Sequence, residues 1–220
     1  MDSIFLEFQS YYNFLHRVFN NGTFSQGGRF YGGFHLELLR NLRKHILING
    51  EPVAEPDFSA LHIRMLYHRE GIDYREDPYA ILCDSKEERK VFKIIFLVAI
   101  NAETQKKAIY GIQKELEENG IPFDTEYQNL KRCLQKVKSV HRPIAKYLNT
   151  AIGLKLQNLD GRITDLILKT LTREEIPVLP VHDSFIVRER DKDRLIEVMK
   201  SSYYRVMEYE PIIEWKGVMY

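Results

Sequence analysis

The spacing of apolar and polar residues predicts helices and short hairpins. Apolar residues recur at helical spacing over 3–20 and 60–70, so each stretch is expected to form an amphipathic helix. Residues 27–33 (GGRFYGG) mix glycine with aromatic residues and predict a loop. Residues 46–59 place an Asn-Gly pair between two apolar strands, which predicts a β-hairpin.

The second half of the chain is expected to be mainly helical. Residues 86–173 have helical periodicity with breaks near 119–122 and 150–153. Residues 178–187 (VLPVHDSFIV) then predict a second hairpin that turns at His182-Asp183. Together these elements predict an α+β protein, in which helices back an antiparallel sheet and a helical insertion separates the two halves of that sheet.

Composition narrows the class of protein. The 220 residues include two cysteines and no CxxC pair, which excludes a disulfide framework and a zinc ribbon. Apolar runs are too short to cross a bilayer and the N-terminus carries no basic leader, so we expect a cytoplasmic protein with no membrane partner.

Charge is balanced overall but not along the chain. Lys and Arg number 32 against 31 Asp and Glu, which excludes binding of nucleic acid by bulk charge alone. Residues 86–150 contain 13 Lys and Arg against 8 Asp and Glu. Such a basic segment suits contact with phosphates, and ordinary solvated helix faces explain it equally well.

Two aspartates stand at strand ends. Asp57 lies where a predicted strand gives way to a helix, and Asp183 lies at the bend of the second hairpin. Neighbouring strand ends can bring two carboxylates together around a pair of divalent ions, and Mg²⁺ binds such carboxylates together with water and phosphate oxygens. Alternatively, each aspartate simply caps or turns the chain.

Three segments occur in the order of polymerase motifs. Residues 56–64 (PDFSALHIR) resemble motif A of family A DNA polymerases, with Asp57 and Arg64 at its aspartate and arginine. Arg89 and Lys93 resemble the Arg-x-x-x-Lys opening of motif B. Residues 181–187 (VHDSFIV) resemble motif C, in the version found in phage-type single-subunit RNA polymerases.

This resemblance implies a polymerase palm with a helical, fingers-like insertion. Asp57 and Asp183 would hold two Mg²⁺ ions, with Mn²⁺ as an alternative. Arg89 and Lys93 would contact the β and γ phosphates of a nucleoside triphosphate, and Lys93 would protonate the leaving pyrophosphate. A primer–template duplex, with DNA favoured, is the implied second substrate. His182 would orient the primer end or merely fill a turn.

Three weaker matches suggest further nucleic-acid contacts. Residues 157–167 (QNLDGRITDLI) resemble the helix before motif C, so Gln157 and Arg162 are candidates for contact with template and primer. An ordinary amphipathic helix explains them as well. Arg29 in the glycine-rich stretch is a candidate for binding a phosphate, or it belongs to a loop packed on its own aromatic residues.

Two positions depart from the family. His62 stands where motif A of the DNA polymerases has a glutamate that helps to exclude ribonucleotides, and Asn101 stands at the tyrosine position of motif B. Both would face the incoming nucleotide, so the choice of sugar and base does not follow from the resemblance.

The expected division of the chain follows the motifs. Residues 1–34 form an N-terminal helix and glycine/aromatic loop, 35–85 the first part of the palm, 86–150 the fingers-like insertion, and 151–220 the second part of the palm. Because 220 residues leave no room for a thumb or an exonuclease domain, we expect a reduced form that synthesises distributively or relies on a protein partner acting as a clamp.

Three functional classes compete. The first is a minimal template-directed DNA polymerase that works by a two-metal mechanism. The second is a degenerate palm that only binds nucleic acid or a replication protein, which the loss of the motif B tyrosine favours. The third is a metal-dependent nuclease, which needs paired carboxylates but has no use for Arg89 and Lys93.

Overall fold

The computed structural model describes residues 14–216, 218 and 219, and these group into two compact units. One unit combines the chain up to Ser59 with the chain from Gln157 onward, and the other comprises Ala60–Leu156. The expected insertion, 86–150, lies within the second unit, which also includes the helix that follows Asp57. Each unit is described by itself below.

The first unit is built on an antiparallel sheet. Among the described residues the strands run in the order β3-β4-β7-β5-β8-β9. Strand β6 lies outside this order and pairs with β7. The strands are β3 (Leu47–Ile48), β4 (Glu51–Ala54), β5 (Asp57–Phe58), β6 (Leu179–Val181), β7 (Ser184–Arg188), β8 (Ile213–Trp215) and β9 (Val218–Met219).

Both predicted hairpins are present. β3 and β4 are joined by Asn49-Gly50, and both residues have positive φ (54° and 79°), as a tight type I′ turn requires. β6 and β7 are joined by His182-Asp183. The predicted helix over 60–70 is also confirmed, as α2 (Leu61–Arg69).

Around Asp57, alternation along β5 and β7 places apolar and polar side chains on opposite faces of the sheet. Phe58 and Phe185 are buried and in edge-to-face contact, and Phe58 also packs on Tyr203 of α7 (Lys192–Met207). Because side chains alternate across a strand, Asp57 and Ser184 point to the opposite face. Shorter helical segments complete this unit: η2 (Phe34–Leu36), α1 (Arg40–Arg43) and η5 (Glu189–Asp191).

The prediction for the N-terminal region was wrong where the structure describes it. Residues 1–13 of the expected helix lie outside the described residues, and His16–Phe19 form strand β1, which pairs with β2 (Gly27–Tyr31). The glycine/aromatic stretch is therefore half of a hairpin and not a loop. Pairing between strands is a tertiary effect that overrides the local helical spacing.

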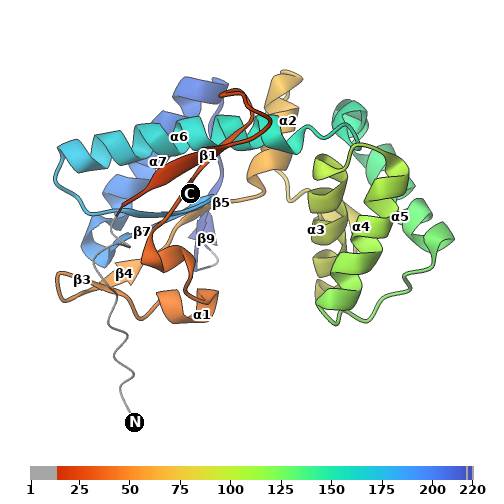
Figure 1. The fold of residues 1–220 in the computed structure, drawn as a ribbon, viewed down its shortest axis with the longest axis horizontal. Coiled ribbons are helices and arrows are strands. Elements are labelled where there is room, and N and C mark those ends of the chain that lie inside the picture. Colours follow the sequence, from red (N-terminus) through yellow and green to blue (C-terminus); the bar gives the residue numbers. More distant parts are fainter. Residues whose placement is uncertain (1–13, 217, 220) are drawn as a thin grey trace, which may run out of the picture. The chain divides into compact units, whose positions relative to one another are not determined.

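This hairpin lies against helix α6 (Gly153–Arg173) in very close contact (Figure 1). A Cβ atom added at Gly161 would stand 2.2 Å from the Gly28 carbonyl oxygen. Arg17 Nε donates to that same oxygen at 2.7 Å, which fixes the position of the Gly28 backbone. Only glycine at position 161 allows the two backbones to approach this closely.

We therefore expect Gly161→Ala to destabilise the protein. Alanine normally stabilises a helix relative to glycine by about 1 kcal/mol, whereas forcing the hairpin away from α6 should cost about 1–3 kcal/mol more than this gain. Urea unfolding monitored by circular dichroism measures the difference. Lys169→Ala, at an exposed position of the same helix, is the control. A variant as stable as the wild type would contradict the close contact.

The second unit is helical, as predicted. It contains α2 (Leu61–Arg69), η3 (Ala80–Leu82), α3 (Lys86–Asn101), α4 (Gln105–Glu118), α5 (Tyr127–Val140), η4 (Arg142–Tyr147) and the first turn of α6. The α-helices are interrupted near 119–122 and 150–153, as predicted. They are also interrupted at 102–104 and at 141–148, where η4 lies. The hydroxyl of Thr104 caps α4 by accepting a hydrogen bond from the Lys107 N–H at 3.2 Å.

Buried aliphatic and aromatic side chains from successive helices form the core of this unit, among them Phe96, Ile112 and Leu134. The described part of the chain contains no helix long and apolar enough to cross a membrane.

Candidate active site

The pairing of β5 with β7 brings the two predicted aspartates next to each other. Asp57 lies directly opposite Ser184, the neighbour of Asp183. The Phe58 N–H donates to the Asp183 carbonyl at 3.0 Å, and the Phe185 N–H donates to Pro56 at 3.1 Å. These bonds flank the Asp57–Ser184 pair, which is thus the closely spaced, non-hydrogen-bonded kind.

The turn that presents Asp183 is tight. His182 adopts a left-handed conformation (φ 56°), which a two-residue hairpin turn requires but which a residue other than glycine rarely adopts. Asp183 itself is exposed, whereas the next four residues of β7 are buried. The hairpin therefore holds the Asp183 carboxylate at the rim of the sheet, where solvent and a ligand can reach it.

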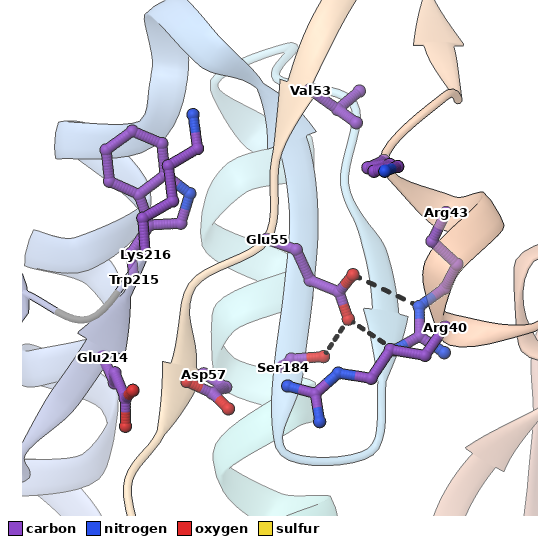
Figure 2. A pocket seen from close by; sticks show the side chains of 10 residues that line it. Arg40, Arg43, Val53, Glu55, Asp57, Ser184, Glu214, Trp215 and Lys216 are labelled. Atoms are coloured by element: carbon purple, nitrogen blue, oxygen red, sulfur yellow. Dashed lines mark hydrogen bonds and ion pairs between the residues drawn. The ribbon is translucent and has the colours of Figure 1, made fainter.

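A polar network supports this turn from the open face of the sheet. The Ser184 hydroxyl lies 2.8 Å from Glu55 Oε1. Arg43 donates to both oxygens of the same carboxylate, at 2.8 and 3.2 Å (Figure 2). Sequence reasoning missed Glu55 and Arg43. Glu55 stands two residues before Asp57, so alternation in an extended chain was a signal that both side chains share a face.

Asp57 sits among other negative charges. Burial, followed by the nearby charges of Asp183 and Glu214, raises the pKa of the Asp57 carboxyl to about 6. Glu214 lies directly opposite Asp57 on β8. Deprotonated Asp57 is therefore unfavourable in the protein alone, and a cation beside it would relieve that unfavourable state.

A cavity of about 350 Å³ opens on this face, and both acidic and basic side chains line it. The charged residues that line it include Glu55, Asp57, Glu214, Arg40 and Lys216 (Figure 2). The charge of Arg40 partly opposes the rise in the pKa of Asp57. The remaining lining residues are Arg43, Lys44, Val53, Ser184 and Trp215. Mixed charge of this kind suits a ligand that carries phosphate groups and bound cations at once.

The residues present suit magnesium better than a metal held entirely by protein. In the described ranges, no three His, Cys, Asp or Glu side chains form a group that could hold a metal ion. Magnesium keeps several waters and is commonly bound by one or two carboxylates plus substrate phosphates. Asp57 and Asp183 fit that donor set.

Arg29 and His182 meet beside the same turn. Arg29 of β2 donates from Nε to Asp160 Oδ2 of α6 at 2.7 Å. Burial, followed by the charge of Arg29, lowers the pKa of His182. The His182 ring is 5.8 Å from that of Tyr31, and its Nδ1 is buried without a hydrogen-bond partner. The histidine is accordingly neutral at pH 7.

The two residues of α6 that were predicted to contact nucleic acid differ in exposure. On α6, Gln157 is half-buried and Arg162 is exposed. Asp160, which sequence reasoning passed over, is the residue of this helix that is tied to Arg29. An aspartate at a fully buried position of an amphipathic helix was the signal that could have identified it.

Arg89 and Lys93 lie on one face of α3 in the second unit. The Arg89 guanidinium and the Lys93 ammonium stand 4.9 and 5.6 Å from the centre of the Tyr79 ring. Arg89 Nη2 also donates to Asp77 Oδ2 at 2.6 Å. Although its partial burial opposes ionisation, the bonds from Arg89 and from a backbone N–H lower the pKa of Asp77. The two cations thus share a face of α3, because residues four apart in a helix lie on the same side.

The remaining predicted site residues also belong to the second unit. Arg64 is buried on α2, and its guanidinium donates to the Tyr74 carbonyl and, at 3.0 Å, to the Glu76 carbonyl. It therefore fastens the loop after α2. His62 is half-buried on the same helix. Asn101 ends α3 at an exposed position and donates to the Leu97 carbonyl at 2.7 Å.

Comparison with known proteins relates this fold to a polymerase domain. No protein-family model and no curated protein matches the sequence. Among solved structures, the chain is similar to the POL domain of Pol1 from M. smegmatis, in a complex with DNA primer-template and dNTP, with a TM-score of 0.57 and 10% identity. The match covers 89% of this chain and 46% of that one, so this chain spans about half of its length. The fold is a polymerase-like palm with antiparallel strands and packed helices.

Proposed function

We propose that this protein is a template-directed nucleotidyltransferase that extends the 3′-hydroxyl of a primer, with DNA as its favoured product. One observation carries the proposal. Two aspartates that are 126 positions apart in the sequence lie close together, Asp57 at the start of β5 and Asp183 in the turn before β7, and Asp57 borders a cavity that cationic side chains also line. The polymerase-like fold and the binding of primer-template and dNTP by the similar domain support the same reading.

In the reaction, the primer 3′-oxygen attacks the α phosphorus of the nucleotide, and the bond between the α and β phosphates breaks. Asp57 and Asp183 would hold two Mg²⁺ ions, with Mn²⁺ as an alternative. When bound, the ions lower the pKa of the 3′-hydroxyl and neutralise charge on the departing pyrophosphate. Arg89 and Lys93 bind the β and γ phosphates, and Lys93 donates a proton to the leaving group.

The other predicted residues complete this assignment. His182 and Arg29 face the primer end, while Gln157 and Arg162 contact the duplex from α6. Arg64 acts through the loop that it fastens, and His62 and Asn101 border the incoming nucleotide. Because neither of the last two reproduces a steric gate of the family, we expect weak discrimination between deoxyribonucleotides and ribonucleotides. A protein partner acting as a clamp would raise the length of product per binding event.

Primer extension tests the proposal. A 5′-labelled primer on a template is incubated with Mg²⁺ or Mn²⁺ and either dNTPs or rNTPs. We expect template-directed lengthening by the wild type and by Asp193→Ala, a change at an exposed residue of α7, and no lengthening by the double variant Asp57→Ala/Asp183→Ala. Shortening of the primer would instead identify a nuclease.

A second candidate is a palm that binds nucleic acid without catalysis. The observation in its favour is Asn101, whose amide is bonded within its own helix and cannot stack under a base as an aromatic residue would. The same assay separates the two candidates. Tight binding of primer–template with neither lengthening nor shortening, under every metal and nucleotide tried, would support this second reading.

A further inference from the structure

We propose that Asp160 is a positioning residue, which holds Arg29 beside the His182-Asp183 turn so that Arg29 contacts the recessed 3′ end of a primer. This inference rests on the proposed function, because it assumes that a primer end is bound at that turn.

The carboxylate of the ion pair between Asp160 and Arg29 is almost completely buried. Asp160 Oδ2 accepts from Arg29 Nε at 2.7 Å, and the two side chains are 3% and 20% exposed. Asp160 is the least exposed carboxylate among the ion pairs of the described residues, and the next, Asp191, is 15% exposed. A guanidinium bound through Nε has a fixed plane, which directs its remaining donors.

The backbone around Arg29 is fixed by the same helix. Gly28 and Gly161 are in contact, as described above, and Asn158 Nδ2 donates to the Phe24 and Gly27 carbonyls at 2.8 and 3.2 Å. Asn158, Asp160 and Gly161 therefore hold the hairpin β1–β2 at Arg29 and at the residues just before it. The helix thus fixes the backbone of Arg29 and its side chain together.

Arg29 is thereby placed next to the His182-Asp183 turn. The charge of Arg29 acts on His182, and the charge of Asp183 acts on Asp160. Tyr31, two residues after Arg29 in β2, touches the His182 ring. Arg29 is therefore placed where a strand end that approaches Asp183 would pass.

Stability alone does not account for a carboxylate at this place. Burial raises the pKa of Asp160 to about 7 even though Arg29 opposes that shift. Ionised Asp160 is thus unfavourable in the folded protein, and buried ion pairs of this kind commonly add little to stability. A role in holding Arg29 for a ligand explains why the charge is buried there.

Binding measurements without catalysis test this role. Fluorescence anisotropy in EDTA gives Kd for a labelled primer–template and for a single strand of equal length. We expect Asp160→Ala and Arg29→Ala each to weaken primer–template binding about tenfold, the size of one well-placed arginine contact. Asp160→Asn should fall between them and the wild type. Binding of the single strand should change less than twofold.

A double-mutant cycle identifies the mechanism. If Asp160 acts only through Arg29, the double variant should bind no more weakly than Arg29→Ala. Asp165→Asn, which alters a surface pair with Lys169 on the same helix, should bind as the wild type does. Losses that add, or equal losses for duplex and single strand, would overturn the proposal.

Variants of Arg29 distinguish a loss of binding from a loss of folding. Should Asp160→Ala unfold, Arg29→Ala with Arg29→Lys decides the matter: lysine keeps the charge but not the fork, so it should bind primer–template about as weakly as alanine. Full binding by Arg29→Lys would contradict a positioned guanidinium. Because no turnover is measured, primer extension can fail while this inference stands, and the reverse can also occur.

Discussion

Asp57→Asn is expected to abolish primer extension and, at the same time, to make the protein more stable at neutral pH. Loss of a carboxylate that binds the metal ions should lower kcat/KM by about a thousandfold or more, the scale of a lost electrostatic contact in the transition state. Single-turnover extension measures this loss. An active Asp57→Asn variant would remove Asp57 from the catalytic centre.

The gain in stability follows from the direction of the pKa shift. The pKa of Asp57 is about 6 in the folded protein and 3.8 ordinarily, so the folded state binds a proton more tightly than the unfolded state does. Stability therefore falls as pH rises from about 4 through about 6, and the full penalty is present above that range. Asparagine carries no charge and avoids the penalty.

The expected gain is about 1–2 kcal/mol at pH 8. A shift of this size corresponds to about 3 kcal/mol, at 1.36 kcal/mol per unit of pKa, and the partial exposure of Asp57 reduces that value through solvent screening. Urea unfolding at pH 8 and at pH 4 measures it, and the gain should nearly vanish at pH 4. Asp165→Asn is the control and should change the stability by less than about 0.5 kcal/mol at either pH.

Magnesium should reverse the ranking of the two proteins. An ion that binds only the folded state raises the unfolding temperature as its concentration increases. We expect Mg²⁺ to stabilise the wild type and to leave Asp57→Asn unchanged, in the absence of nucleotide and DNA. A variant that responds to Mg²⁺ as the wild type does would place the metal elsewhere.

Local signals in the sequence were enough to locate the aspartates. The turn at Asn49-Gly50 depends on two residues with positive φ, and the hairpin at His182-Asp183 depends on its flanking β-branched and aromatic residues. Both hairpins are contacts between near neighbours in the chain, so the sequence contains the information directly. Asp183 is in the turn of the second hairpin, and Asp57 begins β5 just after the first hairpin.

Contacts between distant segments could not be predicted from the local pattern of residues. Strand β1 exists because β2 pairs with it, whereas the spacing of apolar residues over 3–20 predicted a helix. Arg29 and Asp160 are 131 positions apart, and the glycines that let their elements touch look like ordinary loop and helix residues in the sequence. Arg64 is similar, since only the fold reveals that it binds backbone carbonyls.

Lys93→Ala is expected to lower kcat by about a hundredfold to ten-thousandfold, the range for losing a general acid. Lys93 is exposed on α3 beside Arg89, with its ammonium 5.6 Å from the centre of the Tyr79 ring. An exposed ammonium on a flexible stem can follow the β and γ phosphates and release a proton to pyrophosphate as it forms.

Two comparisons distinguish proton donation from simple attraction of the triphosphate. Lys93→Arg keeps the charge but hardly releases a proton, so it should restore KM for the nucleotide while kcat stays low. Lys90→Ala, at another exposed position of the same helix, should retain most of the activity. Kd for primer–template should change less than about twofold in all three variants, because the lysine acts on the nucleotide. If Lys93→Ala weakened duplex binding as much as it slowed incorporation, its charge would serve the nucleic acid and not the leaving group.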